Sequence, residues 1–478
     1  MNQALHPGTG TAWAALGADP ALLDRVTYGG APGGLPARTP VMDLARSSVA
    51  VCSLAAAELA AARTGGPVPR VRVDDGAVTA AFLSDRLVRL DGQAWSTFAP
   101  LSRFWRAADG WVRTHANYPH HRGRLLDALA LPPDAGADAV AEVIAGRRAT
   151  DVEDTVYAAG GLAVAARDAR QWAEHEQGAL VAKHPLLTLE RIGDAPPRRP
   201  GGGPGSGGRP LPCAGLRVLD LTRVLAGPVA TRTLALLGAD VLRIDAPQLP
   251  ESQEAHNDTG MGKRSATLDL GDRHGDRQVF EELLSGADVV VLGYRPGGLD
   301  RFGLTPEELV ARRPGLVVAQ LSAWGRYGPW GERRGFDSLV QVATGIAALE
   351  GGAPGDPDGP GPLGALPAQA LDHGTGYLLA AAVLRALTEQ HRAGGSTVAR
   401  LALAQTAHWL VHGLVTAPGG GTAPGGAAFD AERRTAVRDS PMGRLRYALS
   451  PVGYEGGPAD WARPPGLWGT DAPGWLRA

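Results

Sequence analysis

Lysine is nearly absent from this chain of 478 residues, which has Lys183 and Lys263 alone, although lysines and arginines together number 47. Cysteine is equally scarce, with Cys52 and Cys213. A scaffold held together by disulfides needs more cysteines, so the fold must be stabilised by a hydrophobic core. Cys52 lies in an alanine-rich run, and we expect it to be a small buried side chain.

The chain also lacks a surplus of positive charge. Its formal net charge is −2, whereas proteins that bind nucleic acid usually carry a basic surplus. No stretch reaches the roughly 18 apolar residues of a membrane-spanning helix. Residues 1–20 have no basic segment followed by an apolar block, as a signal peptide would. We therefore expect no nucleic-acid partner, no membrane partner and a cytoplasmic location.

One segment has almost no side chains that a core could bury. Residues 196–211 read PPRRPGGGPGSGGRPL, a composition typical of a flexible linker. This predicts two parts, 1–195 and 212–478. Stretches rich in glycine and proline at 351–363 and 417–428 predict loops within the second part.

The second part alternates short apolar runs with helical stretches. This alternation predicts parallel βαβ units with right-handed crossovers. The turn after the first run lacks the GxGxxG pattern of dinucleotide-binding proteins, although Asp245 ends the second run where a ribose-binding acid would stand. The apolar runs are residues 216–221, 239–245, 287–294 and 316–323.

Residues 67–195 are less regular and are typical of a compact α+β module. Three histidines, His115, His120 and His121, are clustered there. Neither cysteines nor an HExxH pattern accompany them, so we predict no metal site. Tryptophans in the module are expected to pack in its core rather than to stack on bases.

The chain has an internal repeat at a spacing of 329 residues. Asp43 and Asp372 stand at the start of two alanine-rich helical stretches, and each stretch ends at a pair of glycines, 65–66 and 394–395. Helices favour glycine at their C-terminal end for its left-handed backbone, so the stops have a physical reason of their own. The common spacing predicts a duplication.

Three residues could carry chemistry. Asp372 could cap its helix, or it could be a nucleophile that attacks a thioester, with Gly374 and Gly376 allowing backbone amides to approach the oxyanion. Lys263 and Arg264 lie beside glycine in GMGKRSATLDL, where they could bind phosphates or form a solvated basic turn.

These motifs together resemble CoA-transferase family III, which includes formyl-CoA and carnitine CoA-transferases and alpha-methylacyl-CoA racemase. Matching blocks follow one another in the family's order. The resemblance implies an α/β fold with an open parallel Rossmann-like sheet and a smaller α+β domain. The matching blocks are residues 215–247, 262–270, 287–304, 321–345 and 370–387.

The resemblance implies roles for particular residues. The aspartate of the family's D-x-x-x-G block is catalytic, and Asp372 with Gly376 matches it. Gly293-Tyr294 replaces the Asn-Phe that the family often has. The positions that match CoA-contacting segments are Val224, Leu225, Ala226, Lys263, Arg264, Tyr294 and Arg301.

The implied activity is transfer of CoA between an acyl-CoA and a carboxylic acid through an aspartyl anhydride and an aspartyl-CoA thioester. CoA is then a substrate, and no tightly bound cofactor is expected. The racemase branch has a Gly-His-Asp block where this chain has Gly335-Phe336-Asp337, and phenylalanine cannot carry a proton. The alternatives are another acyl-CoA enzyme of the family, a racemase or hydrolase, and a non-catalytic acyl-CoA-binding protein.

The first part resembles a different portion of the same family. Residues 36–195 are similar to the aspartate-bearing helix and the small domain that follows it. Asp43 lacks the glycines that surround Asp372, so we expect a structural role for it. The chain thus resembles two partial copies joined at 196–211. Because members of the family form dimers, the resemblance also implies a homodimer.

Overall fold

The structure is a computed structural model that describes residues 6–30, 34–95, 98–199, 211–272, 275–352, 363–414 and 431–476. The predicted loop at 417–428 lies wholly outside the described residues. Most of the predicted linker and most of the loop at 351–363 do so as well.

The centre of the described fold is a seven-stranded sheet with strand order β10-β9-β8-β11-β12-β13-β7. Every neighbouring pair is parallel except β13 with β7, which is antiparallel. The predicted α/β fold with a parallel sheet is confirmed. The strands are β7 (Leu187–Gly193), β8 (Arg217–Leu221), β9 (Asp240–Asp245), β10 (Arg264–Thr267), β11 (Val289–Leu292), β12 (Val317–Ser322) and β13 (Ser396–Ala402).

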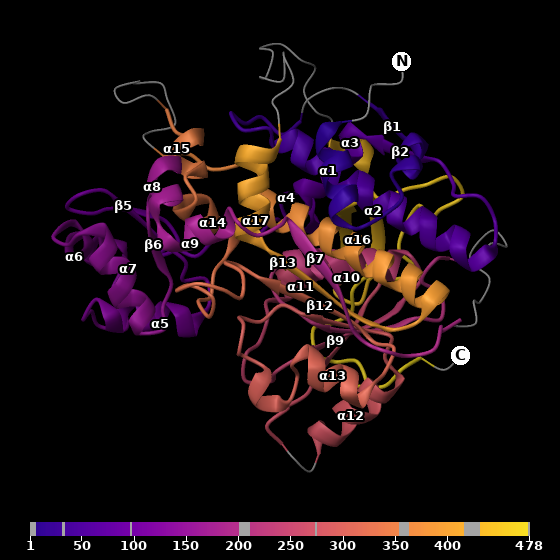
Figure 1. Cartoon of the computed structure of the whole chain (residues 1–478). Coiled ribbons are helices and arrows are strands. Elements are labelled where there is room, and N and C mark those ends of the chain that lie inside the picture. Colours follow the sequence, from indigo (N-terminus) through magenta and orange to yellow (C-terminus); the bar gives the residue numbers. More distant parts are fainter. Residues whose placement is uncertain are drawn as a thin grey trace.

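Helices cover both faces of this sheet, which explains why its strands are apolar along their whole length. α10 (Ala226–Leu236) and α16 (Ala370–Ala393) lie on one face, and α12 (Asp276–Gly286) and α13 (Pro306–Arg312) lie on the other (Figure 1). The α12 and α13 side has a separate hydrophobic core built around Phe280. The chain order along the sheet reverses between β8 and β11, and ligands bind at such a reversal in open α/β sheets.

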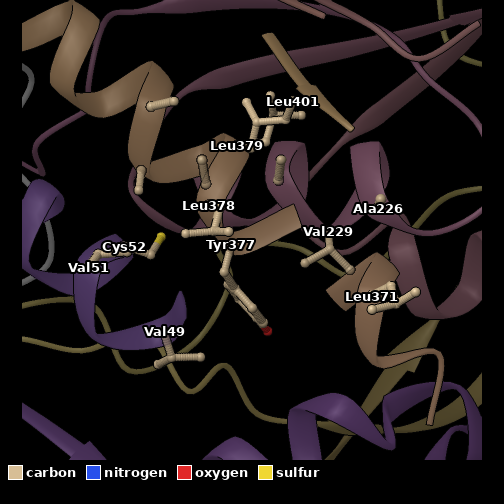
Figure 2. Packing of buried hydrophobic residues seen from close by; sticks show 14 of the residues in the cluster. Val49, Val51, Cys52, Ala226, Val229, Leu371, Tyr377, Leu378, Leu379 and Leu401 are labelled. Carbon is tan, nitrogen blue, oxygen red and sulfur yellow. The ribbon is translucent and has the colours of Figure 1, made fainter. Parts of the chain in front are cut away.

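The longest helix of the first part, α2 (Val41–Thr64), packs along α16. Figure 2 shows Cys52 of α2 close to Leu378 of α16 in the shared core, and both side chains are fully buried. The two helices have 24 residues each and begin 329 residues apart. The helix bounds therefore repeat at the spacing of the sequence, and the duplication itself stays a prediction.

A charged group stands in the middle of this helix contact. Glu58 of α2 is 2% exposed and accepts two hydrogen bonds of 2.8 Å from Arg385 of α16. Arg392 adds a third bond of 3.0 Å. A carboxylate buried so deeply is tolerated because it is paired and hydrogen-bonded. By length and composition α2 could cross a membrane, but 89% of its most apolar window is buried within the protein.

Two short parallel strands lie before and after α2 in the chain. They are β1 (Val26–Gly29) and β2 (Val71–Asp74), which pair over four residues. The neighbouring helices are α1 (Pro7–Ala15), α3 (Asp75–Phe82) and α4 (Ser84–Leu87), with a 3-10 turn at Pro20–Arg25.

The predicted α+β module has its own three-stranded antiparallel sheet and its own core, which includes Trp105 and Leu125. The chain then passes through α8 (Ala169–Glu174) and α9 (Glu176–Val181) to β7. Because β7 is an edge strand of the central sheet, the two parts share that sheet. The module's elements are β4 (Phe104–Arg106), β5 (Trp111–Thr114), β6 (Ala163–Ala165), α5 (Pro119–Ala128), α6 (Ala137–Ala145) and α7 (Ala149–Ala158).

The end of the chain lies against the sheet near β9 and β10. Asp471 accepts a hydrogen bond from Ser265 of β10, and Trp468 donates to Asp245 of β9 at 2.8 Å. The remaining elements are β3 (Arg89–Leu90), β14 (Thr435–Ser440), β15 (Gly443–Ala448), α11 (Gln253–Thr259), α14 (Asp337–Ala343), α15 (Ile346–Glu350), α17 (Leu403–His408), a π-helical turn at Trp409–Gly413 and 3-10 turns at Asp300–Phe302 and Ala431–Arg434.

Candidate active site

A cavity of about 1210 Å³ opens at the carboxyl ends of the parallel strands. Its wall includes the turns that follow β8, β9, β10, β11 and β12, and α5 of the small module closes it from the side. The cavity therefore lies where the chain order of the sheet reverses, which is the expected place for a ligand. Six of the predicted site residues line it: Asp372, Val224, Leu225, Ala226, Tyr294 and Arg301.

Asp372 stands in the first turn of α16 and is 7% exposed. Its backbone N–H donates to Oδ2 of Asp337 at 2.9 Å. The residue at the N-cap is Gln369, and no side chain caps this helix, so the helix-capping interpretation of Asp372 is wrong. Among the described residues no hydrogen bond or ion pair involves the carboxyl oxygens of Asp372.

Two buried carboxyl groups therefore lie close together. Burial raises the pKa of Asp372 well above its usual value, and the negative charge of Asp337 raises it further. Burial also raises the pKa of Asp337 to about 6, although backbone N–H groups and the Gln341 amide stabilise its charged form. A carboxylate that has lost its water and has no cation beside it is poorly stabilised, and such a group is poised to react with an electrophile.

Gly376 brings α16 into contact with α10. A Cβ at this position would lie 2.6 Å from the carbonyl oxygen of Ala226 and 2.9 Å from Cβ of Val229. A Cβ on Gly374 would lie 3.3 Å from Cγ of Leu44 in α2. Both glycines thus permit close helix packing, which differs from the predicted approach to a thioester. Because α16 packs closely on α10 at Gly376, Asp372 and the start of α10 lie at the same cavity.

The turn between β8 and α10 has a strained backbone. Val224 has φ of 70°, a value that is unusual for a β-branched residue. Strain of this kind persists where the surrounding structure enforces it, and it is concentrated at functional sites. Leu225 and Ala226 follow at the N-terminus of α10, where free backbone N–H groups can bind an anion.

Tyr294 and Arg301 lie on the other side of the cavity, after β11. Tyr294 is half-buried, and burial raises the pKa of its hydroxyl to about 12. Arg301 is exposed and its guanidinium lies 4.6 Å from the ring centre of Phe302. Tyr294 therefore keeps its proton at neutral pH, and Arg301 is accessible to an anion.

Lys263 and Arg264 are not among the residues that line the cavity. The side chain of Lys263 is 0% exposed and donates to Asp220 at 3.0 Å and to Thr231 at 2.6 Å. Arg264 pairs with Asp240 at 2.8 Å. The structure thus gives both cations internal partners, because the glycine-rich turn leads directly into strand β10 and directs them into the fold.

Sequence reasoning missed the aromatic wall beside Asp372. Phe336 lines the cavity, and its ring stacks on His115 with 3.7 Å between centres. His121 lies 5.9 Å from the same ring. Tyr118 is fixed by a 2.7 Å hydrogen bond to Glu251. The cluster of histidines was visible in the sequence, but nothing there indicated that α5 would lie against the sheet.

Burial lowers the pKa of His121 to about 2 and that of His115 to about 3, so both imidazoles are neutral. In the part of the chain that the structure describes, no group of three or more histidine, cysteine, aspartate or glutamate side chains could hold a metal ion. The cavity is thus lined by carboxyl groups, Asp372 among them, by the neutral imidazole of His121 and by several arginines.

Part of this chain is similar to known proteins. Residues 213–438 match the model of "CoA-transferase family III". The chain is 36% identical over 219 residues to acetyl-coenzyme A transferase nodX of Hypoxylon pulicicidum, which covers 45% of this chain and 35% of that protein. It is 35% identical over 205 residues to Rv3272 of Mycobacterium tuberculosis, named a probable fatty acyl-CoA transferase, over 40% of this chain and 50% of that protein.

A mouse relative, succinyl-CoA:glutarate CoA-transferase of Mus musculus, is 31% identical over 41% of this chain and 49% of its own length. A crystal structure of Rv3272 is similar with 36% identity and a TM-score of 0.37, over 42% of this chain and 57% of that chain. The chain spans from about a third to half of the curated relatives that it matches. Residues 213–438 of this chain thus match CoA-transferase family III, and the relatives that they resemble are named as CoA-transferases or acyl-CoA transferases.

Proposed function

We propose that this protein transfers CoA between an acyl-CoA and a carboxylic acid, with Asp372 as the nucleophile. The observation that carries the proposal is the state of Asp372, a cavity-lining carboxyl group whose oxygens have no partner among the described residues. The match of residues 213–438 to CoA-transferase family III supports the reaction class, and the D-x-x-x-G match of Asp372 and Gly376 supports the assignment of the nucleophile.

The reaction proceeds by nucleophilic catalysis, which divides one difficult transfer into easier steps. The carboxylate of Asp372 attacks the thioester carbonyl, the C–S bond breaks, and CoA leaves as a thiolate, which gives a mixed anhydride. The thiolate then attacks the aspartyl carbonyl of that anhydride. The donor acid leaves as a carboxylate, and Asp372 now carries CoA as a thioester.

The second half reverses these bonds with another acid. The acceptor carboxylate attacks the aspartyl thioester and CoA thiolate leaves, which forms an anhydride of Asp372 with the acceptor. The thiolate attacks the acceptor's carbonyl carbon. The products are the new acyl-CoA and the free carboxylate of Asp372, so no proton or electron is gained or lost in the cycle.

The cavity has suitable groups for CoA. The N-terminus of α10 at Leu225 and Ala226 can accept a phosphate, and Arg301 is exposed at the same cavity. Arg277 also lines the cavity, and its partner Glu281 is on the helix surface. These groups take the place of Lys263 and Arg264, whose charges are neutralised within the fold. The pantetheine arm would then lead from the strand ends toward Asp372.

The test is to trap the covalent intermediate. Wild-type protein is mixed with an acyl-CoA, treated with hydroxylamine and digested, and the peptide with Asp372 is examined by mass spectrometry for a hydroxamate. The expected result is a hydroxamate at Asp372 that the Asp372→Asn variant does not form. Asp43→Asn is the matched control, because Asp43 occupies the same place in α2 but is paired with Arg46 at 3.0 Å.

The alternatives predict different outcomes. A non-catalytic acyl-CoA-binding protein would bind CoA without forming the adduct. A racemase would exchange the α-proton of the acyl group with solvent deuterium. Phe336 occupies the histidine position of the racemase block and cannot carry that proton. An adduct without deuterium exchange favours CoA transfer, and exchange without an adduct would contradict it.

A further inference from the structure

Seven arginines line the cavity, and they differ in whether a carboxylate neutralises them. Arg223 pairs with Glu251, Arg277 with Glu281, and Arg333 with Asp154 and Glu153. Among the described residues no ion pair involves the other four. Arg301 is one of these and lies beside Phe302, after β11. The remaining three are Arg124, Arg295 and Arg334, here called the arginine triad.

The triad lies where the small module meets the sheet domain. Arg124 of α5 donates to the carbonyl of Gly160 at 3.2 Å, and the hydroxyl of Tyr157 donates to the carbonyl of Arg334 at 2.9 Å. Gly160, Tyr157, Arg295 and Arg334 also line a second hollow next to the main cavity. The side chain of Arg124 and the backbone of Arg334 are therefore held by these contacts, and Arg295 lines both hollows together with Arg334.

The charges of the triad repel one another. Burial lowers the pKa of the Arg334 guanidinium, and the positive charges of Arg124 and Arg295 lower it further. In the second hollow, Asp154 is already paired with Arg333, and Glu332 is exposed. Three neighbouring cations without a carboxylate are a site that an anionic ligand would stabilise.

The triad is close to the reacting carbonyl rather than to the far end of CoA. Arg334 precedes Asp337 by three residues, so their Cα atoms are at most roughly 10–11 Å apart. Asp337 in turn accepts the backbone N–H of Asp372 at 2.9 Å. When the thioester of a CoA reaches Asp372, its phosphates lie at the other end of the pantetheine arm. An anion held by the triad therefore belongs to the acyl group or to the acceptor acid.

We infer that the arginine triad binds the second carboxylate of a dicarboxylic substrate, whose first carboxylate exchanges CoA at Asp372. This inference rests on the proposed function and adds the class of acid to it. Guanidinium groups suit the role because they bind carboxylates with two parallel hydrogen bonds. A phosphate of CoA would suit the same chemistry, so the experiment must separate the two sources.

The experiment is a calorimetric titration of the full chain saturated with CoA, with butanedioate and butanoate as matched probes of equal chain length. Wild-type protein should bind butanedioate at least about tenfold more tightly, the range expected for a charged hydrogen bond. Arg334→Gln and Arg124→Gln should reduce this preference to less than about twofold. Arg334→Lys should restore part of it.

Arg148→Gln is the control, since Arg148 is 70% exposed and pairs with Asp109 away from the cavity. Affinities for CoA and for 3′-dephospho-CoA are measured with each variant and should stay within about twofold of wild type. Arg334→Gln keeps the backbone carbonyl that Tyr157 and Trp324 bind, and thermal unfolding confirms that it folds. If Arg334→Gln does not fold, Arg124→Gln serves as an independent variant.

Three results would overturn the inference. Wild-type protein could bind the two probes equally, or the triad variants could weaken both probes equally. They could also weaken CoA but not 3′-dephospho-CoA, which would assign the triad to a phosphate. Failure of the proposed function is distinguishable, because it shows as a missing hydroxamate at Asp372 while the preference for butanedioate is unaffected.

Discussion

The backbone N–H of Asp372 binds the carboxylate of Asp337 at 2.9 Å, so one buried acid fixes the helix turn that carries the other. The Gln341 amide also donates to Asp337, and Gln341 accepts the N–H of Leu366 at 2.9 Å. The two sequence blocks that contain these aspartates thus form one polar network at the cavity. Its consequence is that the ionisation of Asp372 depends on the charge of Asp337.

Asp372→Asn should stabilise the folded protein at neutral pH while it abolishes CoA transfer. Because the fold raises the pKa of Asp372, the native state binds the proton of this carboxyl group more tightly than the unfolded chain does. Stability contributed by this group is therefore present at low pH and declines as the pH rises above about 4. Thermal unfolding of the wild-type protein and of the variant at pH 4 and pH 7 measures the difference in stability. A larger stabilisation by the variant at pH 4 than at pH 7 would contradict the expected sign.

Asp337→Asn should move the acidic limb of the kcat/KM profile to lower pH. The negative charge of Asp337 raises the pKa of Asp372, and an amide removes that charge while its oxygen still accepts the N–H of Asp372. The attacking group must be ionised, so activity should persist to lower pH. The profile with an acyl-CoA donor tests this, with Asp43→Asn as the control. A shift to higher pH would show that Asp337 does not act through its charge.

Lys263→Met should destabilise the protein by about 3–5 kcal/mol, because it leaves the buried charge of Asp220 without its cation. Combining it with Asp220→Asn should recover most of that loss. Chemical denaturation gives the stabilities. The double variant should show a Michaelis constant for acyl-CoA within about twofold of wild type. A large increase in that Michaelis constant for a stable double variant would indicate that Lys263 contacts CoA, as its sequence motif predicts.

Glu58→Gln should also destabilise the protein by about 3–5 kcal/mol, since Arg385 is 5% exposed and would lose its buried partner. Glu389→Gln is the matched control, because Glu389 pairs with the same arginine but is half exposed. We expect a loss of less than about 1 kcal/mol for it. Equal losses for the two variants would mean that the buried position of Glu58 has no energetic effect.

Cleavage within residues 200–210 should leave the two parts associated. β7 of the first part forms an edge of the central sheet, and α2 packs along α16. A protease site inserted there is cut, and the products are separated by gel filtration. Co-elution with activity intact is expected. Separation into two active species would show that the first part is an accessory module.

The sequence predicted the elements whose physical signals are local. The apolar runs became β8, β9, β11 and β12 because strands buried on both faces must be apolar throughout. The glycine pairs did end α2 and α16, and Gly65 has the left-handed φ of 72°. The position of Asp372 in the cavity agrees with its motif, although the role of Gly376 turned out to be the approach of two helices.

Sequence could not show which cations would line the cavity and which would be enclosed within the fold. Lys263 and Arg223 are both basic residues in turns, yet Lys263 is fully buried with Asp220 whereas Arg223 lines the cavity. The difference depends on partners that are 43 and 28 residues away in the chain. The wall formed by Tyr118, His121 and Phe336 likewise results from the placement of α5 against the sheet, which no local pattern indicates.

The antiparallel course of β7 has a further consequence for engineering. Gly193, at its end, pairs with Ser396 at the start of β13, so the chain leaves β7 at the amino edge of the parallel strands. β8 begins at that same edge, four strand positions away, a span of about 19 Å. The cavity lies at the opposite edge. An affinity tag or a fluorescent label placed between residues 199 and 211 would therefore stand on the side of the molecule away from substrate entry, which makes this the preferred place to immobilise the protein for binding experiments.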